Sequence, residues 1–261
     1  MTPGSVDDPV RALREAIAAA RGILIVTGAG VSAESGVPTF RGEGGLWKRR
    51  RVEDLATPGA FRRDPRTVWE WYAERREAIG RCTPNAAHRA IAALLLRRSD
   101  VTVVTQNVDG LHDRAIIEAG EELPHPRLIH LHGSLFTLRC VSCPWQEPHS
   151  AAPIDPSSEV SLPRCPACGA MARPGVVWFG EPLPEAALRE ASIAATAAEL
   201  CLVVGTSAVV YPAASIPQVA VEAGARLAEF NPSPTPLTPL ATWIFRQAAG
   251  KILPYIIHEV E

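Results

Sequence analysis

The chain has 261 residues, of which 47% are hydrophobic, and its formal net charge at pH 7 is −2. This length exceeds one average domain, and the apolar fraction is sufficient for a sizeable core. The near-neutral charge gives no case for nucleic-acid binding, and no apolar run approaches the ~18 residues of a membrane-spanning helix. We therefore expect neither nucleic acid nor a membrane as a partner.

The first residues and the cysteines indicate the compartment. Met1–Asp8 lacks a basic segment followed by an apolar core, so it is unlike a secretory signal. In a chain of this size without such a signal, six cysteines are more typical of metal ligation or free thiols than of disulfides. The expected location is cytoplasmic.

Predicted helices alternate with short buried strands along most of the chain. The opening helix has Asp8 as its N-cap and Pro9 in its first turn, and Gly22 lies where a C-cap would. Further helices are expected over residues 85–98, 185–198, 213–223 and 254–261. Apolar, often β-branched runs predict strands over residues 23–27, 101–105, 127–131, 200–204, 226–230 and 242–245. This alternation is typical of an α/β fold with a Rossmann-like, doubly wound parallel sheet.

Two segments interrupt the alternation. Residues 46–80 are rich in arginine and are expected to be helical, whereas residues 135–173 carry prolines, serines and four cysteines with little periodicity. We expect these two segments to form a smaller zinc-binding and helical lobe, separated from the sheet by a cleft. Val176–Gly180 is expected to return to the sheet. The Rossmann-like domain is then discontinuous and consists of residues 1–45, 81–134 and 174–261.

The loop after the first strand carries a nucleotide-binding pattern. Gly28, Gly30 and Ala33 match G-x-G-x-x-A, in which the glycines allow a tight turn and close approach of the backbone to a pyrophosphate. Ala33 would let a helix lie close on the strand, and the free N–H groups of that helix would hold phosphate oxygens. A plain strand-to-helix turn is the alternative. Pro38 ends any helix early, so residues 38–45 are predicted to form a loop over the cofactor.

Four cysteines have the spacing of a zinc site. Cys140 and Cys143 form one C-x-x-C pair, and Cys165 and Cys168 form another. Each pair suits one side of a tetrahedral zinc ion, and redox disulfides are the alternative. Four thiolates leave no open position on the metal, so the predicted zinc is structural rather than catalytic.

His132 is the candidate general base. It follows a predicted strand, so it should lie at the same sheet edge as Gln106–Asp109, which follows another strand. Histidine is the usual side chain that exchanges a proton near neutral pH. A lone histidine is more often structural, and that is the interpretation of His88, His112, His125, His130 and His149.

The order of the motifs resembles the sirtuin family, the NAD-dependent protein lysine deacylases. GAGVSAESGVPTFRG, QNVDGLH, LHGS, VVWFGE, GTSAVVYPAA and EFN occur in sirtuin order together with the two cysteine pairs. The resemblance covers residues 22–254. It implies that NAD is consumed as a co-substrate, that acyl-lysine proteins or peptides are the partners, and that nicotinamide and an O-acyl-ADP-ribose are released. We expect a monomer.

The resemblance also implies which residues contact NAD. The nicotinamide end would be lined by Ala29, Phe40 and Arg41, its ribose by Gln106, Asn107 and Asp109, the phosphates by Gly205, Thr206 and Ser207, the adenosine ribose by Asn231, and the adenine by Ala249. Further cofactor contacts would come from Gly28, Gly30, Ser32, Glu34 and Trp47. His132 and Asn107 would be catalytic, with His132 deprotonating a ribose hydroxyl.

The acyl end resembles one class within the family. Tyr72 and Arg75 match the Y-x-x-R pair of class III sirtuins, and Ala56 matches the small residue that widens their acyl pocket. A guanidinium can bind a carboxylate in bidentate fashion, and a tyrosine hydroxyl is a further donor. The alternative is that Arg75 and Arg76 belong to a helix face bonded to Glu70 or Glu74. The substrate backbone would pair with Val176, Val177, Trp178 and Phe179, and Gly175 stands where close relatives have a histidine.

These observations favour removal of succinyl and malonyl groups, with some acetyl, from protein lysines. A general NAD-dependent deacetylase and a protein ADP-ribosyltransferase are the alternatives within the family. Outside it, an NAD-linked oxidoreductase would produce NADH, and a non-catalytic NAD- or ADP-ribose-binding module would turn over no acyl peptide.

Overall fold

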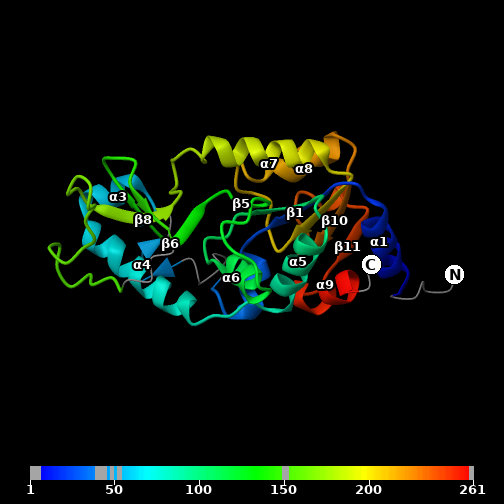
Figure 1. Ribbon diagram of the computed structural model, residues 1–261, viewed down its shortest axis with the longest axis horizontal. Helices are drawn as coiled ribbons and strands as arrows, with labels where there is room; N and C mark the ends of the chain where they lie inside the picture. The colour runs from blue at the N-terminus through cyan, green and yellow to red at the C-terminus, as the bar shows by residue number, and fades with distance from the viewer. Residues whose placement is uncertain (1–6, 39–45, 48–49, 52–54, 149–152, 259–261) are drawn as a thin grey trace.

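The computed structural model describes residues 7–38, 46–47, 50–51, 55–148 and 153–258. Its centre is a six-stranded parallel sheet in the order β11-β10-β9-β1-β4-β5 (Figure 1). The strands are β1 Ile23–Thr27, β4 Val101–Thr105, β5 Leu128–His130, β9 Leu200–Val204, β10 Arg226–Phe230 and β11 Trp243–Phe245. From β1 the chain adds β4 and β5 outward on one side and then β9, β10 and β11 on the other, which is the Rossmann order. The predicted doubly wound fold is confirmed.

Helices cover both faces of this sheet, which explains why its strands are apolar without alternation. Ile23 and Ile25 of β1 pack into the core under α1, α5, α6 and α9, whereas Leu24 and Val26 pack into the core under α7 and α8. Figure 1 shows these two helix groups on opposite sides of the strands. Their bounds are α1 Asp7–Ala19, α5 Ala86–Arg97, α6 Leu111–Glu118, α7 Glu185–Ala197, α8 Ser215–Glu222 and α9 Ala249–His258.

The last helix begins earlier than predicted. We expected it over residues 254–261, but α9 runs over Ala249–His258 with Pro254 inside. Ala249, Leu253 and Ile256 recur at helical spacing and are buried against the sheet. Burial of this stripe outweighs the hydrogen bond that the proline removes.

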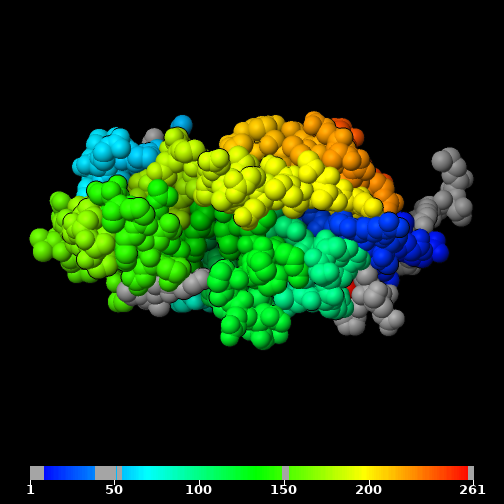
Figure 2. Space-filling model, turned by 45° about the horizontal axis from the view of Figure 1, so that its top comes forward, coloured from blue at the N-terminus to red at the C-terminus, as the bar shows by residue number. Residues whose placement is uncertain are grey.

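A third hydrophobic cluster lies outside the sheet, in a smaller lobe. The lobe contains α3 Pro58–Arg63, α4 Pro65–Gly80 and a three-stranded antiparallel sheet of β6 Gly133–Cys140, β7 Gln146–Glu147 and β8 Ala172–Val176. Trp69, Tyr72 and Trp178 are among its buried side chains. Figure 2 shows the same arrangement on the surface, with α3 and the β6–β8 segment at one end and α7 and α8 covering the other. The assignment of sequence ranges to separate domains stays a prediction.

Two predictions for the small lobe are wrong. Residues 46–80 are not entirely helical, because β2 Leu46–Trp47 pairs with β3 Arg50–Arg51 in an antiparallel ladder. Val176–Gly180 does not rejoin the parallel sheet, because Val176 ends β8 and pairs with Gly133 of β6. Such short pairings are set by tertiary contacts, and they leave no periodicity in the sequence.

Among the described residues, no helix combines the length and the apolar character that crossing a lipid bilayer requires.

Candidate active site

The predicted site residues gather at one edge of the parallel sheet. β1 and β9 are neighbours, but the chain leaves them toward opposite sides, and the carboxyl ends of two such strands are where open α/β sheets bind ligands. Gly28 follows β1 and Gly205 follows β9 at this point. Gln106, His132 and Asn231 follow β4, β5 and β10 at the same edge. The fold thus brings together residues that are more than two hundred positions apart in the sequence.

The glycines of the first loop have a packing role that the sequence pattern does not show. A Cβ on Gly28 would lie 2.7 Å from Thr206 Cβ, and one on Gly30 would lie 2.6 Å from the carbonyl oxygen of Gly205. The N–H groups of Gly28 and Gly30 donate to the carbonyl oxygens of Val204 and Gly205 at 3.1 and 2.7 Å. These glycines therefore allow two backbone loops to touch, and their own amides are not available to hold a phosphate.

The helix after this loop is also shorter and more exposed than the pattern implies. It is a 3₁₀ helix, η1 Ala29–Ser35, and it ends at Gly36, whose φ of 85° is in the left-handed region. The helix stops before Pro38, as predicted. Ala33 is exposed, so the expectation that it packs closely on the strand is wrong.

Ser32 is the centre of a buried hydrogen-bond network at this edge. Its hydroxyl donates to Asp109 Oδ2 at 2.7 Å and accepts from Asn107 Nδ2 at 3.1 Å. His88 Nδ1 accepts from the Asn85 N–H at 3.2 Å, so its Nε2 carries the hydrogen that points to Ser32 Oγ at 3.2 Å. Burial lowers the pKa of His88 to about 3, so this imidazole is neutral. The serine hydroxyl thus uses its full bonding capacity to orient two predicted site residues.

A second histidine continues this network. His112 Nε2 lies 3.0 Å from Thr27 Oγ1, which donates to Thr105 Oγ1 at 2.8 Å. Thr105 Oγ1 in turn accepts from the N–H of Asn107 at 3.1 Å. The rings of His88 and His112 meet edge to face at 4.9 Å, and burial lowers the pKa of His112 to about 4.

Sequence reasoning missed these two histidines as parts of the site. Two signals point to them: Asn85 is an N-cap three residues before His88, and His112 lies inside the quoted QNVDGLH string.

His132 has the geometry of a general base. Its Nδ1 lies 2.9 Å from the carbonyl oxygen of Gln106, which can only accept, so Nδ1 carries the hydrogen and Nε2 has the free lone pair. Burial lowers the pKa of His132, and the bond to Gln106 offsets part of this effect. The imidazole is therefore neutral and able to take up a proton at neutral pH.

The remaining predicted cofactor residues lie along the same edge. Gln106 Nε2 donates to Thr206 Oγ1 at 3.2 Å. Glu34 Oε2 accepts from the N–H of Gly250 at 2.7 Å, so it sits at the start of α9 beside the buried Ala249. Ala29 and Ser207 are half-buried. Phe40, Arg41 and the side chain of Trp47 lie outside the described residues.

The acyl-end residues lie in the aromatic core of the small lobe. Tyr72 is buried, and its hydroxyl oxygen accepts from Trp178 Nε1 at 2.8 Å. Burial raises the pKa of Tyr72, so the phenol keeps its hydrogen. Arg75 is half-buried with its guanidinium 5.3 Å from the Trp71 ring. Burial lowers the pKa of Arg75, and the proximity of Tyr72 and Asp109 opposes this effect.

A buried ion pair shapes the segment expected to receive substrate. Arg173 pairs with Glu181 through both guanidinium nitrogens, at 2.6 and 2.8 Å, and lies 3.4 Å over the Trp178 ring. The N–H of Trp178 donates to Glu181, and the N–H groups of Val177 and Phe179 donate to the carbonyl oxygens of His132 and Ala56. Because these three amides are occupied, a paired substrate would have to donate to carbonyl oxygens here.

Close packing leaves no room for a side chain at Gly175. A Cβ at this position would lie 2.6 Å from Thr137 Cβ. Gly133 opposite is equally constrained, because its Cβ would lie 2.1 Å from the Gly175 carbonyl oxygen and its φ is 73°.

A separate cavity of about 1020 Å³ lies between α4, α6 and β6. Its walls include the Asp113–His130 pair, joined at 3.1 Å, and Phe136, whose ring is contacted by Arg76 and Arg114 at 5.4 and 5.9 Å. None of the predicted site residues lines this cavity.

The four predicted metal ligands converge. The sulfur atoms of Cys140, Cys143, Cys165 and Cys168 all lie within 4.8 Å of one another. The Cys140–Cys168 and Cys143–Cys165 sulfur pairs are each 3.5 Å apart, close to the roughly 3.8 Å expected for tetrahedral zinc with ~2.3 Å bonds. Four thiols in this arrangement fit a structural zinc ion.

Comparison with known proteins agrees with this geometry. A model of the Sir2 family matches residues 28–212. NAD-dependent protein deacylase 2 of Pyrobaculum aerophilum is 49% identical over 245 residues, which cover 94% of this chain and 93% of that protein. NAD-dependent protein deacylase 1 of Pseudomonas aeruginosa is also 49% identical, over 95% of this chain and 98% of that protein. A solved Sir2 homolog–NAD complex has a TM-score of 0.85 at 46% identity, covering 96% and 93% of the two chains. The chain therefore belongs to the Sir2 family, the sirtuins.

Proposed function

We propose that this protein removes succinyl and malonyl groups, and acetyl groups less efficiently, from protein lysines while consuming NAD. The general activity, NAD-dependent protein deacylation, rests on family membership and on relatives that carry this name at 47–49% identity. A related solved structure, Sir2 bound to acetylated peptide, is 28% identical to this chain with a TM-score of 0.81. The proposed preference for succinyl and malonyl over acetyl groups rests instead on the side chains in the small lobe of this protein.

The residues at the sheet edge have defined roles in this reaction. NAD, when bound, would supply an electrophilic ribose carbon. His132 Nε2 would take up a proton from a ribose hydroxyl, and the bond from Nδ1–H to the Gln106 carbonyl would stabilise the charge that develops on the ring. The Ser32 network holds the amide of Asn107 and the carboxylate of Asp109 in fixed orientations beside this site.

The hydrogen bond between Trp178 and Tyr72 carries the proposed acyl preference. It joins the Y-x-x-R pair on α4 directly to the segment proposed to receive substrate. After accepting from Trp178, the Tyr72 hydroxyl still has its own hydrogen, which can be donated to a carboxylate. Arg75 adds a positive charge near Tyr72 and Asp109. A succinyl or malonyl carboxylate that reaches this position meets a guanidinium fork and a phenol donor.

The test compares succinyl- and acetyl-lysine peptides. A hydrogen bond to a charged group contributes about 1.5–3 kcal/mol, which predicts a roughly 10- to 150-fold preference for succinyl-lysine in kcat/KM. Arg75→Met should remove most of this preference through KM, because the carboxylate lies away from the reacting carbonyl. Tyr72→Phe should weaken it less, because it removes a neutral donor.

Arg81→Met, at the exposed end of the same helix, is the matched control and should leave both substrates unaffected. Mass spectrometry of NAD with acetyl-, succinyl- and malonyl-lysine peptides identifies the products. Equal losses for both peptides in Arg75→Met would contradict the acyl preference and leave a general deacetylase. A protein product that carries ADP-ribose, in place of a peptide with free lysine, would indicate ADP-ribosyl transfer.

A further inference from the structure

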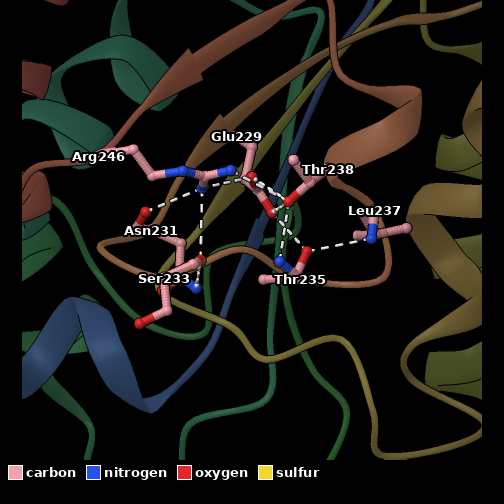
Figure 3. Close-up of polar contacts among 7 residues, drawn as sticks. All are labelled: Glu229, Asn231, Ser233, Thr235, Leu237, Thr238 and Arg246. Carbon is pink, nitrogen blue, oxygen red and sulfur yellow. Dashed lines mark hydrogen bonds and ion pairs between the residues drawn. The ribbon is translucent and has the colours of Figure 1, made fainter.

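A buried carboxylate lies beneath the loop that begins at Asn231. Glu229 of β10 is fully buried, with 0% of its surface exposed. Its Oε2 accepts from Arg246 Nη1 at 2.6 Å and from Thr238 Oγ1 at 2.8 Å, and its Oε1 accepts from Thr235 Oγ1 (Figure 3). Three donors from three points of the chain converge on one carboxylate, as an ionised glutamate in a protein interior requires.

Backbone N–H groups of the loop determine the direction of the hydrogen bonds from the two threonine hydroxyls to Glu229. Thr235 Oγ1 accepts from the N–H of Leu237 at 3.1 Å, and Thr238 Oγ1 accepts from the N–H of Thr235 at 2.8 Å. Each hydroxyl therefore directs its single hydrogen at Glu229. A glutamine at this position would place an N–H₂ group against donors. The loop is thus folded around a negative charge, not merely around a polar group of the same shape.

Arg246 connects this charge to Asn231. Besides Glu229, its Nη1 contacts the carbonyl oxygens of Asn231 and Ser233 at 3.1 and 3.4 Å (Figure 3). Asn231 Nδ2 donates to the same Ser233 carbonyl at 2.7 Å, and the Asn231 N–H donates to the Phe245 carbonyl at 3.1 Å. The backbone and the amide rotation of Asn231 are both fixed, so Oδ1 is presented in one direction as an acceptor.

Asn231 lies where this fixed orientation of its amide would matter for cofactor binding. The carbonyl oxygen of Phe230, one residue earlier, accepts from the N–H of Gly205 at 2.9 Å, so Asn231 stands beside the loop after β9. Family resemblance assigns Asn231 to the adenosine ribose. We propose that Glu229 and Arg246 are positioning residues that hold Asn231 ready to accept a ribose hydroxyl of NAD, an inference that rests on the proposed NAD-dependent reaction.

The test separates cofactor affinity from turnover. Arg246→Met should raise the KM for NAD about tenfold, the scale of one lost hydrogen bond, and should weaken ADP-ribose binding in calorimetry by the same factor. The kcat and the KM for the acyl peptide at saturating NAD should stay within about twofold, because His132 and Gln106 are held by β4 and β5. Arg246→Lys should be intermediate, and Glu229→Gln should resemble Arg246→Met.

Arg226→Met is the matched control, because Arg226 lies at the opposite end of β10 over the Trp243 ring and should leave the KM for NAD unchanged. A fall in kcat with an unchanged KM for NAD would overturn the inference and leave a purely structural ion pair. If Arg246→Met does not fold, Arg246→Lys decides the question. The proposed function would be contradicted if the wild-type protein bound ADP-ribose but deacylated no peptide. The positioning role of Glu229 and Arg246 alone would be contradicted if the wild type and the variants bound ADP-ribose equally well.

Discussion

The sheet edge and the small lobe hold their functional side chains in different ways. At the edge, Ser32, Asn107 and Asp109 are fixed by hydrogen bonds among short side chains in the loops that follow the strands. In the small lobe, Trp178 is held by a buried ion pair and a tyrosine, and four cysteines of the same lobe form a cluster that fits zinc. The edge is thus held by short side chains on the sheet, whereas the small lobe is held by a few long side chains and by a cluster suited to a metal ion.

The largest expected difference between the stabilities of the two regions follows removal of zinc. Metal binding and folding are linked, so chelation should abolish turnover and unfold β6 and β8 while the parallel sheet persists. Hydrogen exchange should show lost protection in β6 and β8 and retained protection in β1, β4 and β9. Cys165→Ser should act like chelation, whereas Cys82→Ser, outside the cluster, should retain zinc. Active protein without zinc in a metal analysis would refute the structural role.

His132→Ala should have the next largest effect, confined to the edge. Loss of a general base predicts a fall in turnover of about 10²-fold or more, with ADP-ribose binding nearly unchanged. Because burial lowers the pKa of His132, wild-type kcat/KM should fall only as pH drops below the usual histidine value of about 6.5, where the base becomes protonated. His125→Ala is the control. Near-normal turnover of His132→Ala would make this histidine structural.

The smallest expected effects are changes in the free energy of unfolding when one hydroxyl is removed from each region. Ser32→Ala removes the partner of three buried groups and should lower the free energy of unfolding by about 2–3 kcal/mol. Tyr72→Phe leaves only Trp178 Nε1 without its acceptor and should cost about 1 kcal/mol. Urea denaturation measures both, with Ser215→Ala at an exposed helix start as the control. A Ser32→Ala loss no greater than that of Ser215→Ala would show that the network adds no stability.

The sequence predicts the parallel sheet well and the small lobe poorly. The strands 23–27, 101–105, 200–204 and 226–230 are found as predicted, because burial on both faces selects continuous apolar runs. The hairpin at 46–51 and the antiparallel pairing of Val176 arise from contacts between distant segments, and no local pattern marks them.

The site shows the same contrast. The cysteine cluster and the placement of His132 could be predicted, because metal spacing and strand ends are properties of the sequence. The packing role of Gly28 and Gly30 could not be predicted, because the loop at Gly205 that they contact is distant in the sequence. The roles of His88 and His112 could not be predicted either. A single histidine makes no repeating pattern in the sequence, and its role depends on the hydroxyl groups that contact it in the fold.

The close contact between Gly133 and Gly175 has a mechanical consequence. The two segments lie so close together that a Cβ on Gly133 would meet the Gly175 carbonyl oxygen and a Cβ on Gly175 would meet Thr137, and the N–H of Val177 is bonded to the carbonyl oxygen of His132 at 2.9 Å beside this contact. The backbone of the base and the segment proposed to receive the substrate are therefore joined directly. A displacement of Val177 has to carry the backbone of His132 with it, which keeps the register between base and substrate.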